Sequence, residues 1–256
     1  MHDIVSRKNP VITHMRKLSK DKSYRDVSNE FVCDGIKLLE SALQSKVEVV
    51  TVLTSQTIPF DLPTKTKVFY TSQSIIDTVS VMKNAQTTVF TCKMNRNFNL
   101  ETTVSGTYVL LAEMQDPGNV GAVIRSAHAF GVDAVILTEG CADVCNPKVV
   151  RASMGSLFKQ KVMHASLQQL KDLKANGTVF IGASVNSMKS ECITKTDLAG
   201  TVIIIGNEGN GISPELLSIC DKHVHIPIAD DCESLNAAAA ASILMWKAAA
   251  DKQSCL

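Results

Sequence analysis

The second half of the chain alternates short apolar runs with helix-forming segments. Residues 107–112, 134–137 and 201–205 are almost wholly apolar, and each run is followed by a polar loop or a helical pattern. An apolar run without polar alternation is typical of a strand buried on both faces. Such strands separated by helices predict a parallel sheet that helices cover on both sides. The predicted fold class is therefore α/β, with a parallel-sheet α/β/α domain over residues 106–256.

Within this domain we expect further strands from 162 and at 178–183 and 223–228. Helices are expected at 120–130, 149–156, 166–175, 213–220 and 235–251. The first hundred residues read as a smaller α/β domain, with a helix beginning at Asn9-Pro10. Helices are also expected there at 34–45 and 73–81, and strands at 47–53 and 87–92. Residues 93–99 are polar and lack either period, which indicates a linker. The predicted organisation is 1–95, a linker at 96–105, and 106–256.

Composition leaves the partner open. Of the 256 residues 45% are apolar and 20% charged, as in soluble globular proteins, and the net charge of +1 does not indicate a nucleic-acid partner. The charge is uneven, however, because residues 7–25 carry seven basic residues against Asp21 alone. This basic segment is interpreted either as a phosphate-binding surface or as a solvated helix face. Its basic members are Arg7, Lys8, Arg16, Lys17, Lys20, Lys22 and Arg25.

The cysteines do not form a zinc motif. None of the eight lies in a Cys-x-x-Cys pair, so we expect reduced thiols, mostly in the core, and no metal. His223 and His225 alternate as on a strand, with no third ligand type beside them in sequence. Residues 1–8 contain no apolar core of a signal peptide, and no apolar stretch is long enough to span a bilayer. We therefore expect a cytoplasmic protein without a membrane partner.

Three segments next to predicted strands carry candidate chemistry, at the sheet edge where α/β proteins bind ligands. The first is residues 113–127, where a polar turn opens a helix at Asn119 and Arg125 follows six residues later. Gly121 and Ala122 share the face of Arg125, so small residues clear the space around it. The simpler interpretation of this segment is an N-capped amphipathic helix with a surface arginine.

The second segment, residues 203–215, runs from an apolar strand into three glycines. Ser213 then provides an N-cap and Pro214 the first helical residue. The spacing Gly-x-x-Gly-x-Gly and its late position do not fit a dinucleotide fingerprint. A tight turn is the simpler interpretation, although Glu208 between glycines is unusual for a mere turn.

The third segment, residues 226–237, ends a strand and crosses a polar loop. Ser234 and Asn236 flank the start of the last helix. A serine N-cap is the simpler interpretation here.

Together these segments resemble the three motifs of the SpoU (TrmH) RNA methyltransferases, of the trefoil-knotted SPOUT class. The resemblance covers residues 107–256. It rests on Asn119 and Arg125, Arg151-Ala152-Ser153-Met154-Gly155, Gly206-Asn207-Glu208-Gly209, Ile226-Pro227 and Ser234-Leu235-Asn236. The first hundred residues resemble the family's small substrate-binding domain, most clearly at Phe31-Val32-Cys33-Asp34-Gly35. The sequence departs from the family at Asp230, where Gly is frequent, and at Ala237, where Val is common.

The resemblance implies S-adenosylmethionine-dependent methylation of a ribose 2′-hydroxyl in RNA, by a homodimer that contacts through the C-terminal domain. It implies ribosomal more than transfer RNA as substrate. The implied catalytic residues are Arg125, Asn119, Glu208, Ser234 and Asn236. The implied cofactor-binding residues are Gly206, Asn207, Gly211, Ile226, Ile228 and Leu235. We expect RNA contacts from Arg16, Lys17, Lys20, Lys22 and Arg151.

Methyl transfer from a sulfonium to a hydroxyl is an in-line displacement that depends on positioning. Arg125 is very hard to deprotonate, so we expect it to clamp a phosphate and stabilise the developing alkoxide, with Ser234 and Asn236 orienting the reactants. The small residues 237–241 allow other backbone to approach the last helix. Ile243, Leu244 and Trp246 give that helix apolar bulk for a dimer contact.

Three other functions stay open. A knotted domain could hold RNA without activity, although the intact site residues argue against it. A nucleotide-cofactor enzyme of the doubly wound class would need its glycine loop after the first strand. A knotted enzyme that methylates a base is the third, and Ser234-Leu235-Asn236 favours ribose.

Overall fold

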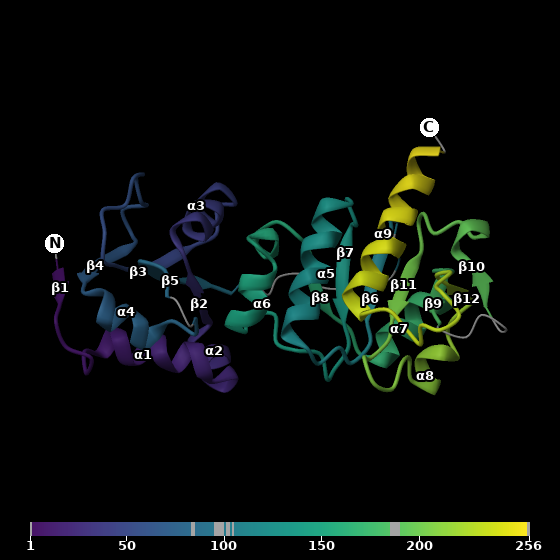
Figure 1. Ribbon diagram of the computed structural model, residues 1–256, viewed down its shortest axis with the longest axis horizontal. Helices are drawn as coiled ribbons and strands as arrows, with labels where there is room; N and C mark the ends of the chain where they lie inside the picture. Colours follow the sequence, from purple (N-terminus) through teal and green to yellow (C-terminus); the bar gives the residue numbers. More distant parts are fainter. Residues whose placement is uncertain are drawn as a thin grey trace. The chain divides into compact units, whose positions relative to one another are not determined.

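The computed structural model describes residues 2–82, 85–94, 100, 103, 105–184 and 190–254 (Figure 1). The chain divides into two compact units. The first contains Met1–Asn95 and Asp143–Lys159, and the second contains Arg96–Ala142 and Gln160–Leu256. The domain boundaries drawn from sequence stay a prediction, and most of the predicted linker at 96–105 lies outside the described residues.

The first unit is built on a mixed five-stranded sheet in the order β1-β4-β3-β5-β2. β1 and β3 run parallel to β4, whereas β5 runs antiparallel to both β3 and β2. The bounds are β1 (His2–Ile4), β2 (Glu30–Asp34), β3 (Val49–Thr54), β4 (Lys67–Thr71) and β5 (Thr88–Lys93). Its helices are α1 (Pro10–Lys20), α2 (Lys22–Ser28), α3 (Ile36–Gln44), α4 (Gln73–Val79) and α6 (Pro147–Ala152).

Alternating residues of this sheet feed two separate apolar clusters. Val32 packs with residues of α1 and α4, whereas its neighbours Phe31 and Cys33 pack with residues of α3 and α6. Because successive side chains of a strand point to opposite faces, both faces of the sheet are buried. The predicted helix start at Asn9-Pro10 is confirmed, since the Asn9 side chain accepts a hydrogen bond from the Val11 N–H at 2.9 Å.

The segment Asp143–Lys159 belongs to the first unit although it lies far along the chain. Asp143 pairs with Arg25 at 2.6 Å, and the Arg25 side chain is only 4% exposed. The helix expected at 149–156 is instead α6, which begins at Pro147 after an Asn146 cap. It ends early because Met154 and Gly155 have φ of 50° and 86°, left-handed values that stop a helix. A 3₁₀ turn, η1 (Ser156–Phe158), follows.

The second unit is built on a seven-stranded sheet in which every neighbouring pair is parallel, in the order β10-β12-β9-β11-β6-β7-β8. The predicted parallel α/β fold is therefore confirmed. The strands are β6 (Tyr108–Leu111), β7 (Ala134–Leu137), β8 (Val162–His164), β9 (Phe180–Ala183), β10 (Glu191–Cys192), β11 (Val202–Ile205) and β12 (Lys222–His225). The helices are α5 (Pro117–Ala129), α7 (Leu167–Ala175), α8 (Pro214–Leu217) and α9 (Ala237–Ser254), with a 3₁₀ turn η3 (Ile193–Lys195).

Helices α5 and α9 lie side by side in the second unit (Figure 1). The hydroxyl groups of Ser126 on α5 and Ser242 on α9 are hydrogen-bonded at 2.8 Å. This contact brings the helix of the first candidate segment against the helix that follows the third. No helix in the described part of the chain is both long and apolar enough to cross a membrane.

Candidate active site

The loop after β11 is closed on itself by backbone hydrogen bonds. Asn207 N–H donates to the Gly211 carbonyl at 2.8 Å, and Gly211 N–H donates to the Asn207 carbonyl at 3.0 Å. A Cβ on Gly206 would lie 2.4 Å from the Gly211 carbonyl carbon, so only glycine fits there. Gly211 has φ of +68°, which also favours glycine. Two of the three predicted glycines are thus required by the shape of the loop.

Asn207 ties this loop to the segment after β6. Its Nδ2 donates to the Glu113 carbonyl at 2.7 Å, while its Oδ1 accepts from the N–H groups of Gly209 at 2.8 Å and Asn210 at 3.1 Å. β11 and β6 are neighbours in the sheet, so their C-terminal loops emerge together. Asn207 therefore has a structural role in shaping the loop, in addition to the cofactor contact that its motif implies.

A chain of three side chains joins all three candidate segments. Asn236 Nδ2 donates to Asn119 Oδ1 at 3.0 Å, and Asn119 Nδ2 donates to Glu208 Oε1 at 3.0 Å. Backbone N–H groups of Gln115 and Asp116 also donate to the Glu208 carboxylate, each at 3.4 Å. The structure thus brings together three of the five predicted catalytic residues, which lie far apart in sequence.

The polarity of this chain follows from the carboxylate. An ionised carboxylate only accepts hydrogen bonds, so Asn119 must turn its amide nitrogen toward Glu208 and its oxygen toward Asn236. Burial alone would raise the pKa of Glu208, but the hydrogen bonds from Asn119 and the two backbone N–H groups hold that pKa below its usual value. Glu208 is therefore fixed as a carboxylate, and it fixes the direction of both amides.

Helix starts in the site differ from the sequence prediction. α5 begins at Pro117 and is capped by Asp116, whose Oδ1 accepts from the Asn119 N–H at 2.8 Å. The sequence reasoning missed Asp116, although Asp followed by Pro is a recognisable helix start. The last helix is capped by Asn236 and not by Ser234, since Asn236 Oδ1 accepts from Ala238 N–H at 3.0 Å and Ala239 N–H at 3.2 Å.

One predicted helix and one predicted strand also end earlier than expected. α8 stops at Leu217, one turn after the Ser213 cap and Pro214, whose predicted roles are confirmed. β12 stops at His225, two residues before Pro227, which has no N–H to donate to a neighbouring strand.

Arg125 and Ser234 are both exposed. Arg125 lies on α5 with no ion-pair partner among the residues that the structure describes. The Ser234 hydroxyl likewise has no hydrogen-bond partner within that part of the chain. Both side chains are therefore available to a ligand, and neither takes part in the chain formed by Asn236, Asn119 and Glu208.

The resemblance implies backbone contacts to the cofactor at Ile226 and Leu235 and a further cofactor contact at Ile228, all of them between β12 and α9. All three residues are half-buried, and their N–H and carbonyl groups have no hydrogen-bond partner in the described ranges. Half-buried backbone groups of this kind can serve as donors and acceptors for a nucleoside. Together with the glycine loop, which brings backbone close to a ligand, they fit an adenosyl cofactor.

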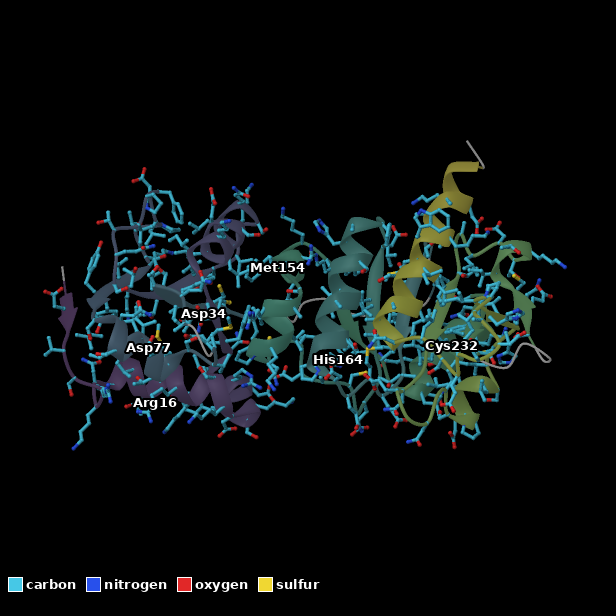
Figure 2. The ribbon with its side chains drawn as sticks, in the orientation of Figure 1. Arg16, Asp34, Asp77, Met154, His164 and Cys232 are labelled. Atoms are coloured by element: carbon cyan, nitrogen blue, oxygen red, sulfur yellow. The ribbon has the colours of Figure 1, made fainter. Side chains whose placement is uncertain are left out.

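The predicted RNA-binding residues lie in the first unit. Arg16, Lys17 and Lys20 are exposed on α1, and Figure 2 marks Arg16 there. Lys22 is exposed but pairs with Asp26 at 2.8 Å. Arg25 does not belong to this surface, because it is buried against Asp143 and donates to the Leu18 carbonyl at 2.7 Å. Arg151 is exposed on α6.

Within the described residues, no group of three or more His, Cys, Asp or Glu side chains is arranged so that it could hold a metal ion. Cys33, Cys92 and Cys145 are buried, as expected of core thiols, whereas Cys232 is exposed in the loop before α9. His223 and His225 lie on β12, and His225 Nδ1 is 3.0 Å from the Ser190 hydroxyl.

Known proteins resemble both parts of the chain. Residues 106–246 match the SpoU rRNA Methylase family, and residues 9–89 match the MRM3-like substrate binding domain. The 23S rRNA (guanosine(2553)-2'-O)-methyltransferase RlmP of Bacillus subtilis is 34% identical over 251 residues, covering 96% of this chain and 98% of the relative.

Two solved structures share the fold over almost the whole chain. The AdoMet-bound rRNA methyltransferase from Sinorhizobium meliloti has a TM-score of 0.84 at 25% identity, covering 99% of this chain and 98% of its own. The SpoU methyltransferase AviRb from Streptomyces viridochromogenes, in complex with AdoMet, has a TM-score of 0.82 at 26% identity, covering 96% and 99%.

Proposed function

The chain belongs to the SpoU rRNA Methylase family, and we propose on this basis that it methylates a ribose 2′-hydroxyl of ribosomal RNA. The family inferred from the three sequence motifs is thereby confirmed, and S-adenosylmethionine is its cofactor. The observation that carries the proposal is the hydrogen-bonded chain of Asn236, Asn119 and Glu208, because it joins all three motifs at one end of a parallel sheet.

In this proposal, backbone holds the cofactor and side chains hold the acceptor. The glycine loop at Gly206, Asn207 and Gly211 and the backbone of Ile226, Ile228 and Leu235 bind S-adenosylmethionine. The cofactor supplies an electrophilic methyl group when it is bound. The knotted path through these loops, which the family resemblance implied, is part of the same proposal.

Arg125 is the proposed catalytic residue that engages the acceptor nucleotide. Its guanidinium is unpaired within the described residues and exposed, so it can clamp a phosphate through two parallel hydrogen bonds and stabilise the developing alkoxide. Asn119, held by Glu208 and Asn236, positions the ribose, and the free Ser234 hydroxyl contacts it. Because an arginine is very hard to deprotonate, it acts here as a clamp and not as the base.

The first unit is proposed to bind the RNA, with Arg16, Lys17, Lys20, Lys22 and Arg151 as phosphate contacts. Its match to a substrate binding domain supports this role. We further propose a homodimer through the second unit, where Trp246 on α9 is 57% exposed and offers an apolar contact. Ribosomal RNA as substrate implies a location in the cytoplasm.

Methylation of purified ribosomal RNA with labelled S-adenosylmethionine, followed by mass spectrometry of the ribonucleotides, tests the function directly. Arg125→Ala should abolish transfer yet leave cofactor affinity, measured by titration calorimetry, within about twofold. Arg125→Lys should also be poor, because lysine lacks the bidentate fork. Methylation of a base, or loss of cofactor binding in Arg125→Ala, would contradict the assignment.

Salt dependence tests the proposed RNA surface. Each phosphate contact lowers log affinity with log salt by roughly 0.7 to 0.9, so replacing Arg16, Lys17 and Lys20 by Ala should reduce the slope by about two to three units. Cofactor affinity should not change, because those residues lie in the other unit. An unchanged slope would show that α1 is only a solvated face.

A further inference from the structure

A recess in the first unit lies at the C-terminal end of β2, whereas the candidate active site described above belongs to the second unit. It is formed by β2, by Val79 at the end of α4 and residues 80–82 after it, and by α6. The centre of a water-sized group can occupy about 20 Å³ of it, and the whole recess measures about 330 Å³ including space open to solvent. This is room enough for one group the size of a water molecule or an amino group. Figure 2 marks Asp34, which lines it.

The walls of this recess are apolar and its charged groups are few. Val32, Val79 and Val150 line it, together with the carboxylate of Asp34 and the guanidinium of Arg151. A concave apolar surface with a small number of polar groups is typical of ligand sites. Neither charged group takes part in the methyl-transfer site proposed above.

The two carboxylate oxygens of Asp34 differ in their hydrogen bonding. Its Oδ2 accepts a short hydrogen bond from the Ser80 hydroxyl, whereas its Oδ1 is buried and has no partner among the described residues. Burial raises the pKa of Asp34, although the Ser80 hydroxyl, the nearby backbone N–H of Gln86 and the positive charge of Arg151 act against this rise. A buried acceptor without a donor costs free energy, and a donor arriving from outside removes that cost.

The mouth of the recess carries surface suited to a flat ring. Val81 is 47% exposed beside it, and the Arg151 guanidinium donates to the Met82 sulfur. Bases of single-stranded RNA stack on apolar or guanidinium surfaces and present their edges to polar groups. A cationic side chain of a protein partner would suit the carboxylate, but Arg151 would repel it, whereas a neutral amine is not repelled.

We propose that this recess, named here the Asp34 pocket, binds one unpaired RNA base whose exocyclic amine donates to Asp34 Oδ1. The proposal rests on the proposed function, since it supplies a base contact for the same RNA substrate. The amine enters the recess, the ring lies against Val81 and Met82, and Arg151 contacts the ring face or the adjacent phosphate. Uracil has no exocyclic amine, so the pocket selects guanine, adenine or cytosine.

Nucleoside monophosphates test the contact without any methyl transfer. In the full-length protein with ¹³C-labelled valine methyl groups, at least one of GMP, AMP and CMP should shift the signals of Val32, Val79 and Val150. UMP and IMP, which lack the amine, should not shift them. Asp34→Asn should lose the shift, because its amide nitrogen replaces the free acceptor when its oxygen stays on Ser80. Equal shifts from UMP or IMP, or no shift from any nucleotide, would overturn the proposal.

Kinetics with ribosomal RNA separate this pocket from the active site. Asp34→Asn should raise the KM for RNA about tenfold, with kcat and cofactor affinity within about twofold of wild type. Glu40→Gln, an exposed carboxylate on α3, is the matched control and should change nothing. Asp34→Asn should also be no less stable, because it removes a buried charge that lacks a full set of partners.

Two failures are distinguishable. If the wild-type protein methylates no ribosomal RNA, the proposed function fails, and filter binding of RNA still compares wild type with Asp34→Asn. If the wild type is active and Asp34→Asn has the same KM but unfolds more easily, Asp34 is a structural residue beside a water-filled cavity, and the pocket proposal is wrong.

Discussion

The donor-to-acceptor direction of the hydrogen-bonded chain of Asn236, Asn119 and Glu208 can be reversed by substituting its two end residues. In Asn236→Asp, a carboxylate oxygen replaces the amide nitrogen that donates to Asn119, so two acceptors face each other. Asn119 cannot turn its amide to help, because its nitrogen is needed by Glu208. Adding Glu208→Gln releases this constraint at Asn119, since glutamine can donate to Asn119 while Asn119 donates to the new aspartate. The glutamine nitrogen then faces the Asp116 N–H, which donates to Glu208 Oε1 at 3.4 Å in the wild type, and this weak contact is lost.

The size of the effect follows from the groups involved. A neutral hydrogen bond contributes about 0.5–1.5 kcal/mol, and this one is partly exposed, so we expect Asn236→Asp to lose about 1 kcal/mol at that contact. The aspartate still caps α9, and its charge near the helix start is favoured by about 0.3–1 kcal/mol, which masks part of the loss. The charge of the aspartate stabilises the start of α9 equally with glutamate or with glutamine at position 208. The double-mutant cycle should therefore report a coupling of about 1 kcal/mol between the two positions.

Urea unfolding of the four proteins measures this coupling. Trp246 is the single tryptophan of the chain and lies on α9, so its fluorescence reports the unit that contains the site. Repulsion between the introduced aspartate and the Glu208 carboxylate would also produce coupling, and the same cycle in an Asn119→Ala background controls for it. The reasoning is refuted if the coupling is absent, or if it survives undiminished without Asn119.

Three further outcomes are expected. Gly206→Ala should lower the free energy of unfolding by about 1–3 kcal/mol and weaken cofactor binding more than tenfold in calorimetry. Gly209→Ala should be tolerated, because a Cβ there would lie 3.6 Å from its nearest neighbour, Asn207 Oδ1. Arg25→Met should cost about 3 kcal/mol in urea unfolding followed by circular dichroism, because it leaves Asp143 unpaired with its side chain only 15% exposed. Burial alone would raise the pKa of Glu30, but its basic neighbours hold that pKa below the usual 4.5. The wild type should therefore have a higher free energy of unfolding than Glu30→Gln above pH 4.5. This difference should shrink as the pH falls through the lower pKa of the folded state.

The repeating pattern of the second unit was readable because burial on both faces leaves a strong signal in sequence. The run at Ala134–Leu137 was predicted with its bounds as the structure has them, and all four residues are buried. The short β4, whose residues are mostly half-buried, was not predicted. Local pattern found uniformly buried strands such as β7 but missed β4, and it also missed β2, whose first four residues are all buried.

The sequence suggested residues for the site but not their hydrogen-bond partners. The resemblance to the SpoU motifs implied roles for Gly206, Glu208 and Asn236 without showing that Asn119 joins the last two. That link spans residues 119 to 236 and depends on the order of strands in the sheet, which sequence does not specify. The burial of Arg25 was missed for the same reason, because its partner Asp143 is 118 residues away.

The Glu208 carboxylate is engaged in hydrogen bonds, whereas the Arg125 guanidinium has no ion-pair partner among the described residues. Glu208 would repel an RNA phosphate, but Asn119 and two backbone N–H groups already donate to it, so part of its charge is compensated within the protein. Arg125 has no ion-pair partner among the described residues, and in the proposed function its guanidinium binds an incoming phosphate. We therefore expect that replacing Glu208 disturbs the shape of the site, whereas replacing Arg125 weakens RNA binding and leaves the shape intact.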